Sequence, residues 1–238
     1  MKSRLGVNVD HIATLRNARG EGHPDPISYA RQVMNFGANS ITIHLREDRR
    51  HIRDEDVAIF SKIKRVPINL EMAANNEMLK IALKYKPNFV CIVPEKRNEI
   101  TTEGGLNIKK NKKIIKKVIS KLNSKKIRTS LFINPNIKDV FASKELNAKC
   151  VELHTGKFAL KVKNNKNYLV EFKKIKNCAT LAKKLGMEVH AGHGLDYKST
   201  KILRKIKSIE EFNIGHFIIG EAIMFGMKKV ITNFRKIL

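Results

Sequence analysis

The stretch SITIHLREDRRH, residues 40–51, combines the two features that decide the fold. Its first half alternates apolar and polar residues, with Ile41 and Ile43 on one face, as a short β-strand does. Its second half, from His44 to His51, brings together two histidines, three arginines and two acids. A strand that runs into so much charge indicates a buried element that ends at a polar site.

Units of this kind recur along the chain. Eight short β-rich runs alternate with segments of helical pattern: Leu5–Val9, Ser40–Leu45, Pro67–Met72, Phe89–Val93, Ile127–Ile133, Cys150–His154, Met187–Ala191 and Phe212–Ile219. Such alternation predicts parallel strands joined by crossover helices. Eight units in 238 residues predict an α/β fold, a (β/α)8 TIM barrel, as one domain over residues 1–238. A doubly wound open sheet is the alternative, but the first strand lacks the glycine-rich turn typical of that fold.

The segments between the runs carry signals for helix boundaries. Asp25 and Pro26 predict a helix start, because aspartate caps a first turn and proline fits its first position. Gly37 is expected to end that helix. A last helix is expected from about Glu221 to the C-terminus.

The formal net charge of +26 permits two interpretations. One is a basic protein that binds nucleic acid. The other is a set of lysines spread over solvated helix faces. Residues 108–126 favour the second, because Ile114, Ile115, Val118, Ile119 and Leu122 form one apolar stripe at helical spacing and lysines occupy the other faces. Aromatic residues make up only 6% of the chain, with no tryptophan, so bases would find few stacking partners. Nucleic acid is therefore the less favoured partner.

Three features bear on location. The apolar part of the N-terminus is interrupted by Asn8 and Asp10, which is not typical of a signal peptide. No apolar run approaches the ~20 residues that a transmembrane helix needs. The cysteines Cys91, Cys150 and Cys178 lie far apart and form no C-x-x-C pair, which favours reduced thiols. We expect a cytoplasmic protein without a membrane partner.

Polar residues gather where the expected strands end. Period-two alternation puts four pairs on common faces: Asn8 with Asp10, His44 with Arg46, Asn69 with Glu71, and Glu152 with His154. In a TIM barrel these carboxyl ends meet at one mouth, where catalytic residues lie. Any single residue here is as well explained by a structural hydrogen bond. The whole set predicts an active site, because burying so many polar groups is costly without a ligand or partner.

The residue types suggest proton transfer on phosphorylated substrates. Histidine is the side chain type that titrates near neutrality, so His44 and His193 can act as acid or base, and Glu71 and Glu152 lie on inward strand positions. Metal binding is the competing interpretation, but no H-E-x-x-H motif is present, and we expect no metal. Candidates for anion binding are Arg16 and Arg19 after the first strand, Arg46, Arg49, Arg50 and His51 after the second, Thr101–Gly105 after the fourth, and the glycines near His193 and His216. Two such sites in one mouth predict two phosphate groups.

Longer motifs resemble a known family. They are Gly6–Gly20, His44–Ile52, Asn69–Met72, Val93–Arg97, Thr101–Gly105, Glu152–Gly156, Ala191–Leu195 and Asn213–His216. In order and from end to end, they are similar to the pyridoxine 5′-phosphate synthase family. That resemblance implies a (β/α)8 barrel with extra helices, assembled as a homo-octamer. It also implies condensation of 3-amino-2-oxopropyl phosphate with 1-deoxy-D-xylulose 5-phosphate to pyridoxine 5′-phosphate, phosphate and water, without a cofactor.

The resemblance also implies residue roles. His44 and Glu71 would accept protons, His193 would donate one, and Glu152 would stabilise charge in a transition state. The deoxyxylulose phosphate would be bound by Asp10, His11, Arg46, His51 and Thr101. The amino ketone phosphate would be bound by Asn8, Arg19, Gly194, Gly215 and His216.

Two residues depart from the family pattern. His190 stands where asparagine is expected, and Glu221 where arginine is expected. Counting by parity from His193 predicts that His190 faces the helices and is structural. Another phosphosugar-handling barrel, such as an aldolase or isomerase, remains an alternative. A Schiff-base aldolase would need an inward lysine, which the expected strands lack.

Overall fold

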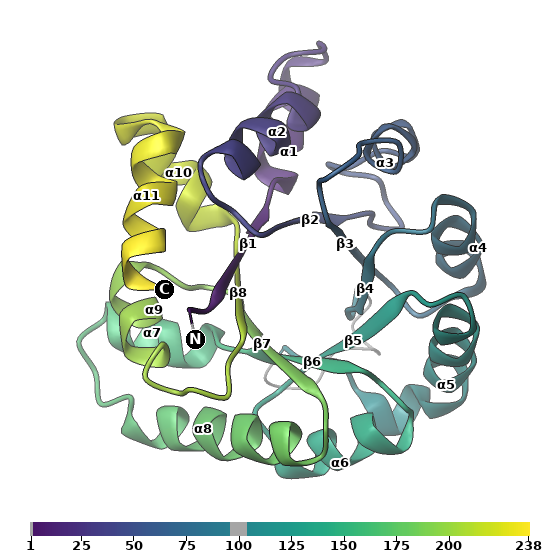
Figure 1. Cartoon of the computed structure of the whole chain (residues 1–238), viewed down its shortest axis with the longest axis vertical. Coiled ribbons are helices and arrows are strands. Elements are labelled where there is room, and N and C mark those ends of the chain that lie inside the picture. The colour runs from purple at the N-terminus through teal and green to yellow at the C-terminus, as the bar shows by residue number, and fades with distance from the viewer. Residues whose placement is uncertain (1, 96–103) are drawn as a thin grey trace.

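The computed structural model describes residues 2–95 and 104–238, and within them eight parallel strands close into a barrel in chain order (Figure 1). The strands are β1 (Arg4–Asn8), β2 (Ser40–His44), β3 (Ile68–Met72), β4 (Phe89–Ile92), β5 (Arg128–Ile133), β6 (Cys150–His154), β7 (Glu188–Gly192) and β8 (Glu211–Ile214). β8 pairs in parallel with β1, which completes the ring. The predicted (β/α)8 TIM barrel is confirmed. The predicted substrate contact Thr101 lies outside the described residues.

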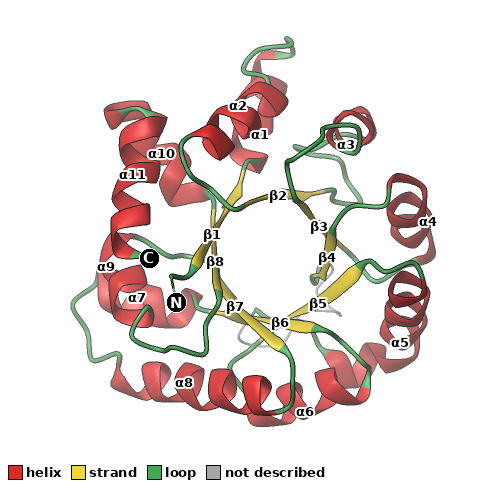
Figure 2. Cartoon of the chain, in the orientation of Figure 1, coloured by secondary structure: helices red, strands yellow, loops and turns green. Residues whose placement is uncertain are grey.

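Helices form the outer ring around the strands (Figure 2). They are α1 (Asp10–Arg19), α2 (Pro26–Asn35), α3 (Asp54–Phe60), α4 (Asn76–Tyr85), α5 (Ile108–Ser124), α6 (Ile137–Glu145), α7 (Gly156–Lys163), α8 (Leu169–Lys184), α9 (Tyr197–Leu203), α10 (His216–Phe225) and α11 (Met227–Ile237). The side chain of Asp25 caps α2 as predicted, by accepting from the amides of Ile27 and Ser28. None of the described helices is long and apolar enough to cross a membrane.

The C-terminal part of the barrel differs from the sequence prediction. The apolar run Phe212–Ile219 predicts one strand, but β8 ends at Ile214 and α10 begins at His216. The expected last helix is also divided, because Gly226 adopts a φ of 78° between α10 and α11. Short apolar runs do not distinguish a buried strand from a buried helix, which explains the error. The correct boundary places His216 at the start of a helix, at the mouth of the barrel.

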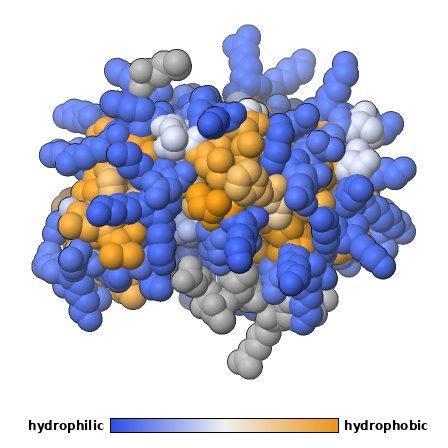
Figure 3. All heavy atoms as spheres, turned by 90° about the horizontal axis from the view of Figure 1, so that it is seen from below, coloured by the Kyte–Doolittle hydropathy of each residue, from blue (hydrophilic) through white to orange (hydrophobic). Residues whose placement is uncertain are grey.

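The molecular surface is strongly hydrophilic. Figure 3 shows a side of the molecule on which polar side chains cover most of the surface and apolar ones appear in separate patches. The lysines of α5 are exposed, whereas Ile115, Val118, Ile119 and Leu122 on the same helix are buried. This arrangement confirms that the lysines of this segment occupy the solvated faces of an amphipathic helix.

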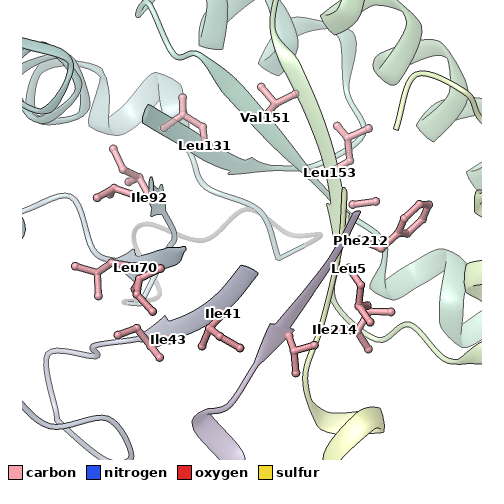
Figure 4. Packing of buried hydrophobic residues seen from close by; sticks show 14 of the residues in the cluster. Leu5, Ile41, Ile43, Leu70, Ile92, Leu131, Val151, Leu153, Phe212 and Ile214 are labelled. Carbon is pink, nitrogen blue, oxygen red and sulfur yellow. The ribbon is translucent and has the colours of Figure 1, made fainter. Parts of the chain in front are cut away.

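The apolar core lies between the barrel and its helices. Leu5, Ile41, Leu70, Leu131 and Phe212 are fully or almost fully buried members of this cluster, and Figure 4 shows such side chains on strands around the barrel. The alternate strand positions point inward and are mostly polar. Ser40, Glu211 and Asn213, for example, all lie where a side chain on Gly6 would project. Strand alternation therefore separates an apolar shell from a polar interior.

His190 lies on the opposite face from the one predicted. It is 1% exposed, and its ring lies inside the barrel beside Glu188, Glu211 and Asn213. The parity count from His193 was wrong because β7 ends at Gly192, and His193 has a φ of 79° outside the strand. Alternation holds only while the backbone stays extended.

Candidate active site

The first two strands are tied together at the mouth by Asp10. The Nδ2 atom of Asn8 donates to Oδ2 of Asp10 at 2.7 Å, and the Asp10 amide donates back to Oδ1 of Asn8 at 2.8 Å. Oδ1 of Asp10 accepts from the backbone amide of His44 at 2.8 Å. Burial raises the pKa of Asp10 to about 6, although the charge of His44 opposes the rise. These bonds fix the end of β2 relative to the start of α1.

The His44 ring lies between two carboxyl groups. Its Nε2 atom is 3.0 Å from Oε1 of Glu95, and its Nδ1 atom is 3.8 Å from Oε2 of Glu71. Glu95 is itself fixed, because its Oε2 accepts from the amide of Glu47 at 2.8 Å. Burial opposes ionisation of Glu95, but its hydrogen bond with His44 lowers the pKa of Glu95 below the usual value. An ionised Glu95 therefore orients the His44 ring.

Glu71 has a different character from Glu95. Burial, with the nearby Glu152 and Asp10 carboxylates, raises the pKa of Glu71 well above its usual value. The shift favours the protonated form of Glu71, which lies beside an imidazole that can exchange its proton. A carboxyl group of raised pKa is a good general acid, and once ionised a good general base.

Glu152 lies inside the barrel on β6 and is held by Asn213. The Asn213 Nδ2 atom donates to Oε2 of Glu152 at 2.6 Å. Gly192 on β7 leaves the room for this carboxylate, because a Cβ atom there would overlap Oε1 of Glu152. Burial raises the pKa of Glu152 to about 7, although the charge of His190 and the bond from Asn213 oppose the rise. The ionisation of Glu152 is thus balanced near neutrality.

His193 stacks on a second histidine. The rings of His154 and His193 lie 4.7 Å apart with 29° between their planes, and Phe132 packs edge-on against His154 at 5.2 Å. Burial lowers the pKa of His193, and burial together with His193 lowers the pKa of His154 to about 4. The stack therefore fixes the orientation of the His193 ring.

The ends of β1 and β8 meet at a further histidine pair. His11 and His216 lie 5.1 Å apart between ring centroids. Gly215 packs against Asn8 so closely that a Cβ atom there would lie 2.9 Å from the Asn8 Cβ. The Nδ1 atom of His11 is buried without a hydrogen-bond partner among the described residues. This corner therefore offers an unsatisfied polar atom beside the N-terminus of α10, where anions bind favourably.

The arginines predicted for anion binding separate into two groups. Arg16 forms a buried two-bond pair with Asp56 at 2.6 and 2.8 Å, Arg49 pairs with Asp54 and Glu77, and Arg50 pairs with Asp48. The expectation that Arg16, Arg49 and Arg50 serve as anion ligands is not supported, because carboxylates already occupy them. Within residues 2–95 and 104–238, the Arg46 guanidinium has only a 3.3 Å contact with Asp48. Arg19 lies at the exposed end of α1, 3.5 Å from Glu21.

His51 lies at the same mouth in a neutral state. Its ring centroid is 5.8 Å from that of His44, and its Nδ1 atom accepts from the amide of Ile52 at 3.0 Å. Burial and the charge of His44 lower the pKa of His51 to about 4. His51 can therefore offer only a neutral Nε2–H to a ligand.

Two sets of three potential metal ligands exist among the described residues. Asp10, His44 and His51 form one, and Glu188, His190 and Glu211 the other. In the first set, Oδ1 of Asp10 accepts from the backbone amide of His44, and Nδ1 of His51 accepts from the backbone amide of Ile52. In the second, guanidinium groups of Arg4 and Arg128 bond the carboxylates. Internal hydrogen bonds thus account for both arrangements without an ion.

The structure brings most of the predicted site residues into this one region. Contacts connect them from Asn8 and Asp10 to His44 and Glu71, and separately place Gly215 beside Asn8 and His11 beside His216. Gly194, at a φ of 77°, packs against Gly156 after β7. Sequence reasoning gave no role to Glu95, His154 or Asn213. Glu95 follows β4 within a family motif, and His154 shares a face with Glu152, so both carried a usable signal.

Solved structures support the architecture. The 3-keto-L-gulonate-6-phosphate decarboxylase of Vibrio cholerae superposes with a TM-score of 0.65 at 14% identity, over 100% of this chain and 97% of that one. The tryptophan synthase A-subunit of Pyrococcus furiosus superposes with a TM-score of 0.61 at 14% identity, over 97% and 96% of the two chains. At such low identity the likeness concerns the barrel fold alone.

Sequence relatives are far more similar. The pyridoxine 5′-phosphate synthase of Pelagibacter ubique is 63% identical over 98% of this chain and 98% of its own length. That of Zymomonas mobilis is 50% identical over 98% of this chain and 90% of its own. The family model for the pyridoxal phosphate biosynthesis protein PdxJ matches residues 5–238. The chain is therefore an enzyme that belongs to the family of the pyridoxal phosphate biosynthesis protein PdxJ.

Proposed function

We propose that this enzyme is a pyridoxine 5′-phosphate synthase. It condenses 3-amino-2-oxopropyl phosphate with 1-deoxy-D-xylulose 5-phosphate and releases pyridoxine 5′-phosphate, phosphate and water. The observation that carries the proposal is the position of His44 between Glu71 and Glu95, at a barrel mouth that also holds Glu152 and His193. Relatives with this name match nearly the whole chain, which supports the same chemistry here.

Ring formation needs several proton transfers, and the site offers groups suited to them. An amine must add to a ketone, water must leave, and carbon-bound protons must be removed before the ring becomes aromatic. We assign His44 and Glu71 as proton acceptors and His193 as the proton donor. The ammonium group of the amino ketone would favour the ionised form of Glu71, which can then accept a proton. Glu152 would stabilise the positive charge that develops on the imine nitrogen.

Two phosphate groups require two polar binding regions. Asp10, His11, Arg46 and His51 are assigned to the deoxyxylulose phosphate, with Thr101 beyond the described residues. The amino ketone phosphate is assigned to Asn8, Arg19, Gly194, Gly215 and His216. Arg46 suits the first role because its guanidinium makes one weak contact within the described chain. The buried Nδ1 of His11, which has no partner among the described residues, lies beside the start of α10 and supports an anion at the boundary of the two regions.

The proposal includes an assembly and a location. We propose a cytoplasmic homo-octamer that uses no cofactor. Ile223, Met224 and Phe225 at the end of α10 are 73%, 77% and 61% exposed, which favours a covering subunit. Size-exclusion chromatography with light scattering would give the subunit number, and a monomer would contradict this part.

A direct assay tests the activity. Chelator-treated enzyme is mixed with 1-deoxy-D-xylulose 5-phosphate and freshly generated 3-amino-2-oxopropyl phosphate, while pyridoxine 5′-phosphate fluorescence and phosphate release are followed together. We expect both products to appear together, and both to be lost in His193→Ala. A folded enzyme that releases neither would refute the proposal. Other phosphosugars and salt-dependent nucleic acid binding would then be tested.

A further inference from the structure

The N-terminal half of the barrel interior contains a group of charged side chains, here called the floor cluster, in which His190 and Glu211 are buried and the others are partly exposed. It consists of Arg4 on β1, Arg128 on β5, Glu188 and His190 on β7, and Glu211 on β8. Arg4 bonds both Glu188 and Glu211, the latter at 2.6 Å, and Arg128 bonds Glu188. None of these residues has a role in the proposed chemistry.

His190 is placed between the two carboxylates of the floor cluster. Its Nε2 atom is 3.0 Å from Oε1 of Glu188, and its Nδ1 atom is 3.8 Å from Oε1 of Glu211. Nε2 is also 3.3 Å from the Arg4 guanidinium, which could donate to a neutral ring. The shorter contact with Glu188 requires a hydrogen on Nε2, because two acceptors would repel each other. With a carboxylate facing each nitrogen, the imidazolium is the form that fits.

Charge balance extends the floor cluster to Glu152. Two guanidinium groups and an imidazolium against two carboxylates leave one net positive charge, which an ionised Glu152 balances. His190 pairs in register with Glu152 on β6 and with Glu211 on β8. Asn213 lies between them: its Nδ2 atom donates to Oε2 of Glu152 at 2.6 Å and lies 3.5 Å from Nδ1 of His190, which in the imidazolium is itself a donor and forms no hydrogen bond with it. A neutral ring would leave the buried Glu152 carboxylate without this countercharge.

Two glycines make this arrangement possible. A Cβ atom on Gly6 would overlap Oδ1 of Asn213, and one on Gly192 would overlap Oε1 of Glu152. The missing side chains allow Asn213 and Glu152 to reach across the barrel interior above His190. The floor cluster is thus in direct contact with a group of the active site rather than separated from it by an apolar layer.

Every strand but β2 contributes a titratable or charged group near His190 and Glu152. Besides His190 and Glu152 they are Arg4, Glu71, Cys91, Arg128, Cys150, Glu188 and Glu211. Burial disfavours the imidazolium, but nearby Cys150 and Glu211 raise the pKa of His190 well above its usual value. β2 contributes the uncharged Ser40, whose hydroxyl donates to Glu211 at 3.0 Å.

We propose that His190 is a positioning residue, whose imidazolium, held by the floor cluster, keeps the Glu152 carboxylate ionised during the reaction, so that the carboxylate stays in place on its bond from Asn213. The part that concerns the reaction rests on the proposed function. Asparagine, the residue that the family resemblance leads us to expect here, carries no charge and could not do this. His190 therefore extends the working range of Glu152 toward lower pH.

The first test measures the protonation of the Glu152 carboxyl group directly and does not depend on enzyme turnover. Infrared difference spectroscopy follows the titration of the Glu152 carboxyl group, which is assigned by its loss in Glu152→Gln. We expect the midpoint of this titration to move up by about one pH unit or more in His190→Asn and in His190→Gln, because an adjacent positive charge is lost. Ser40→Ala is the matched control, because it removes the hydrogen bond to Glu211 without changing any charge. It should leave the midpoint of the Glu152 titration unchanged.

The second test connects the Glu152 titration to the reaction. The acid limb of the kcat/KM profile should move to higher pH by the same amount in His190→Asn. A limb that moves by about one pH unit lowers activity about tenfold at low pH, and the activity recovers at high pH.

Two results would overturn the inference. One is an unmoved Glu152 titration in both His190 variants. The other is a neutral His190 in ¹⁵N spectra of the wild-type protein at neutrality, a measurement that no misfolded variant can obscure. A Glu152 titration that moves in a protein without synthase activity would refute the proposed function alone.

Discussion

The Nε2 atom of His44 lies 3.0 Å from Oε1 of Glu95, a residue 51 positions further along the chain. This contact joins the ends of β2 and β4 and fixes which nitrogen of His44 faces Glu71. A carboxylate that orients a catalytic imidazole also stabilises the imidazolium that forms when the ring accepts a proton. Glu95 is therefore expected to contribute to the rate without touching substrate.

Replacing Glu95 by glutamine should lower kcat about tenfold to about a hundredfold, with a small change in KM. Glutamine retains the shape and one hydrogen bond but removes the negative charge. Steady-state kinetics with both substrates measure the effect. Glu77→Gln, which neutralises an exposed carboxylate paired with Arg49, is the control. Wild-type turnover in Glu95→Gln would show that the contact has no catalytic role.

Glu71→Gln should abolish turnover while substrate binding persists. Burial already raises the pKa of Glu71, so a neutral amide resembles its resting state and should not disturb the fold. What glutamine cannot do is accept a proton. Isothermal titration with each phosphorylated substrate should give dissociation constants close to those of the wild type. Lost binding in a folded variant would instead assign Glu71 to substrate recognition.

Arg46→Ala should weaken binding of 1-deoxy-D-xylulose 5-phosphate about tenfold or more, as expected for a charge-assisted hydrogen bond worth about 1.5 to 3 kcal/mol. Among the described residues its guanidinium contacts only Asp48, at 3.3 Å, so the side chain is available to a phosphate. Arg31→Ala removes the same charge from an exposed position on α2 and serves as control. An unchanged KM for this substrate in Arg46→Ala would exclude the contact.

Strand alternation predicted the barrel and the inward position of Glu152 because both depend on local period-two patterns. The partners of these residues could not be predicted in the same way. Arg16 pairs with Asp56, 40 positions away, and this pairing removes it from the set of anion ligands. The inward position of His190 was missed because alternation fails at His193, where the backbone leaves the strand. Sequence patterns thus indicated the region of the candidate site, whereas long-range pairings decide which of its residues are available.

Asp10 should make the protein less stable as pH rises from about 4 to about 6. Burial raises its pKa from 3.8 to about 6, so the folded state binds the proton more tightly than the unfolded state. The stability from this group is present at low pH and is lost as pH rises through the folded pKa. The loss is on the order of 3 kcal/mol at neutrality.

Asp10→Asn should remove that loss and stabilise the protein at neutral pH. The amide can still accept from the His44 backbone, but its NH2 group would face Nδ2 of Asn8, so one hydrogen bond worth about 1 kcal/mol is forfeited. The net gain is then about 2 kcal/mol. Urea unfolding at several pH values should show a flatter pH dependence than the wild type, and Asn39→Asp, a charge change at the other end of the barrel, should not reproduce it. An Asp10→Asn variant no more stable at neutrality would mean that Asp10 is ionised at little cost. A variant that is more stable but binds substrate less well would identify the buried carboxylate as a group retained for function.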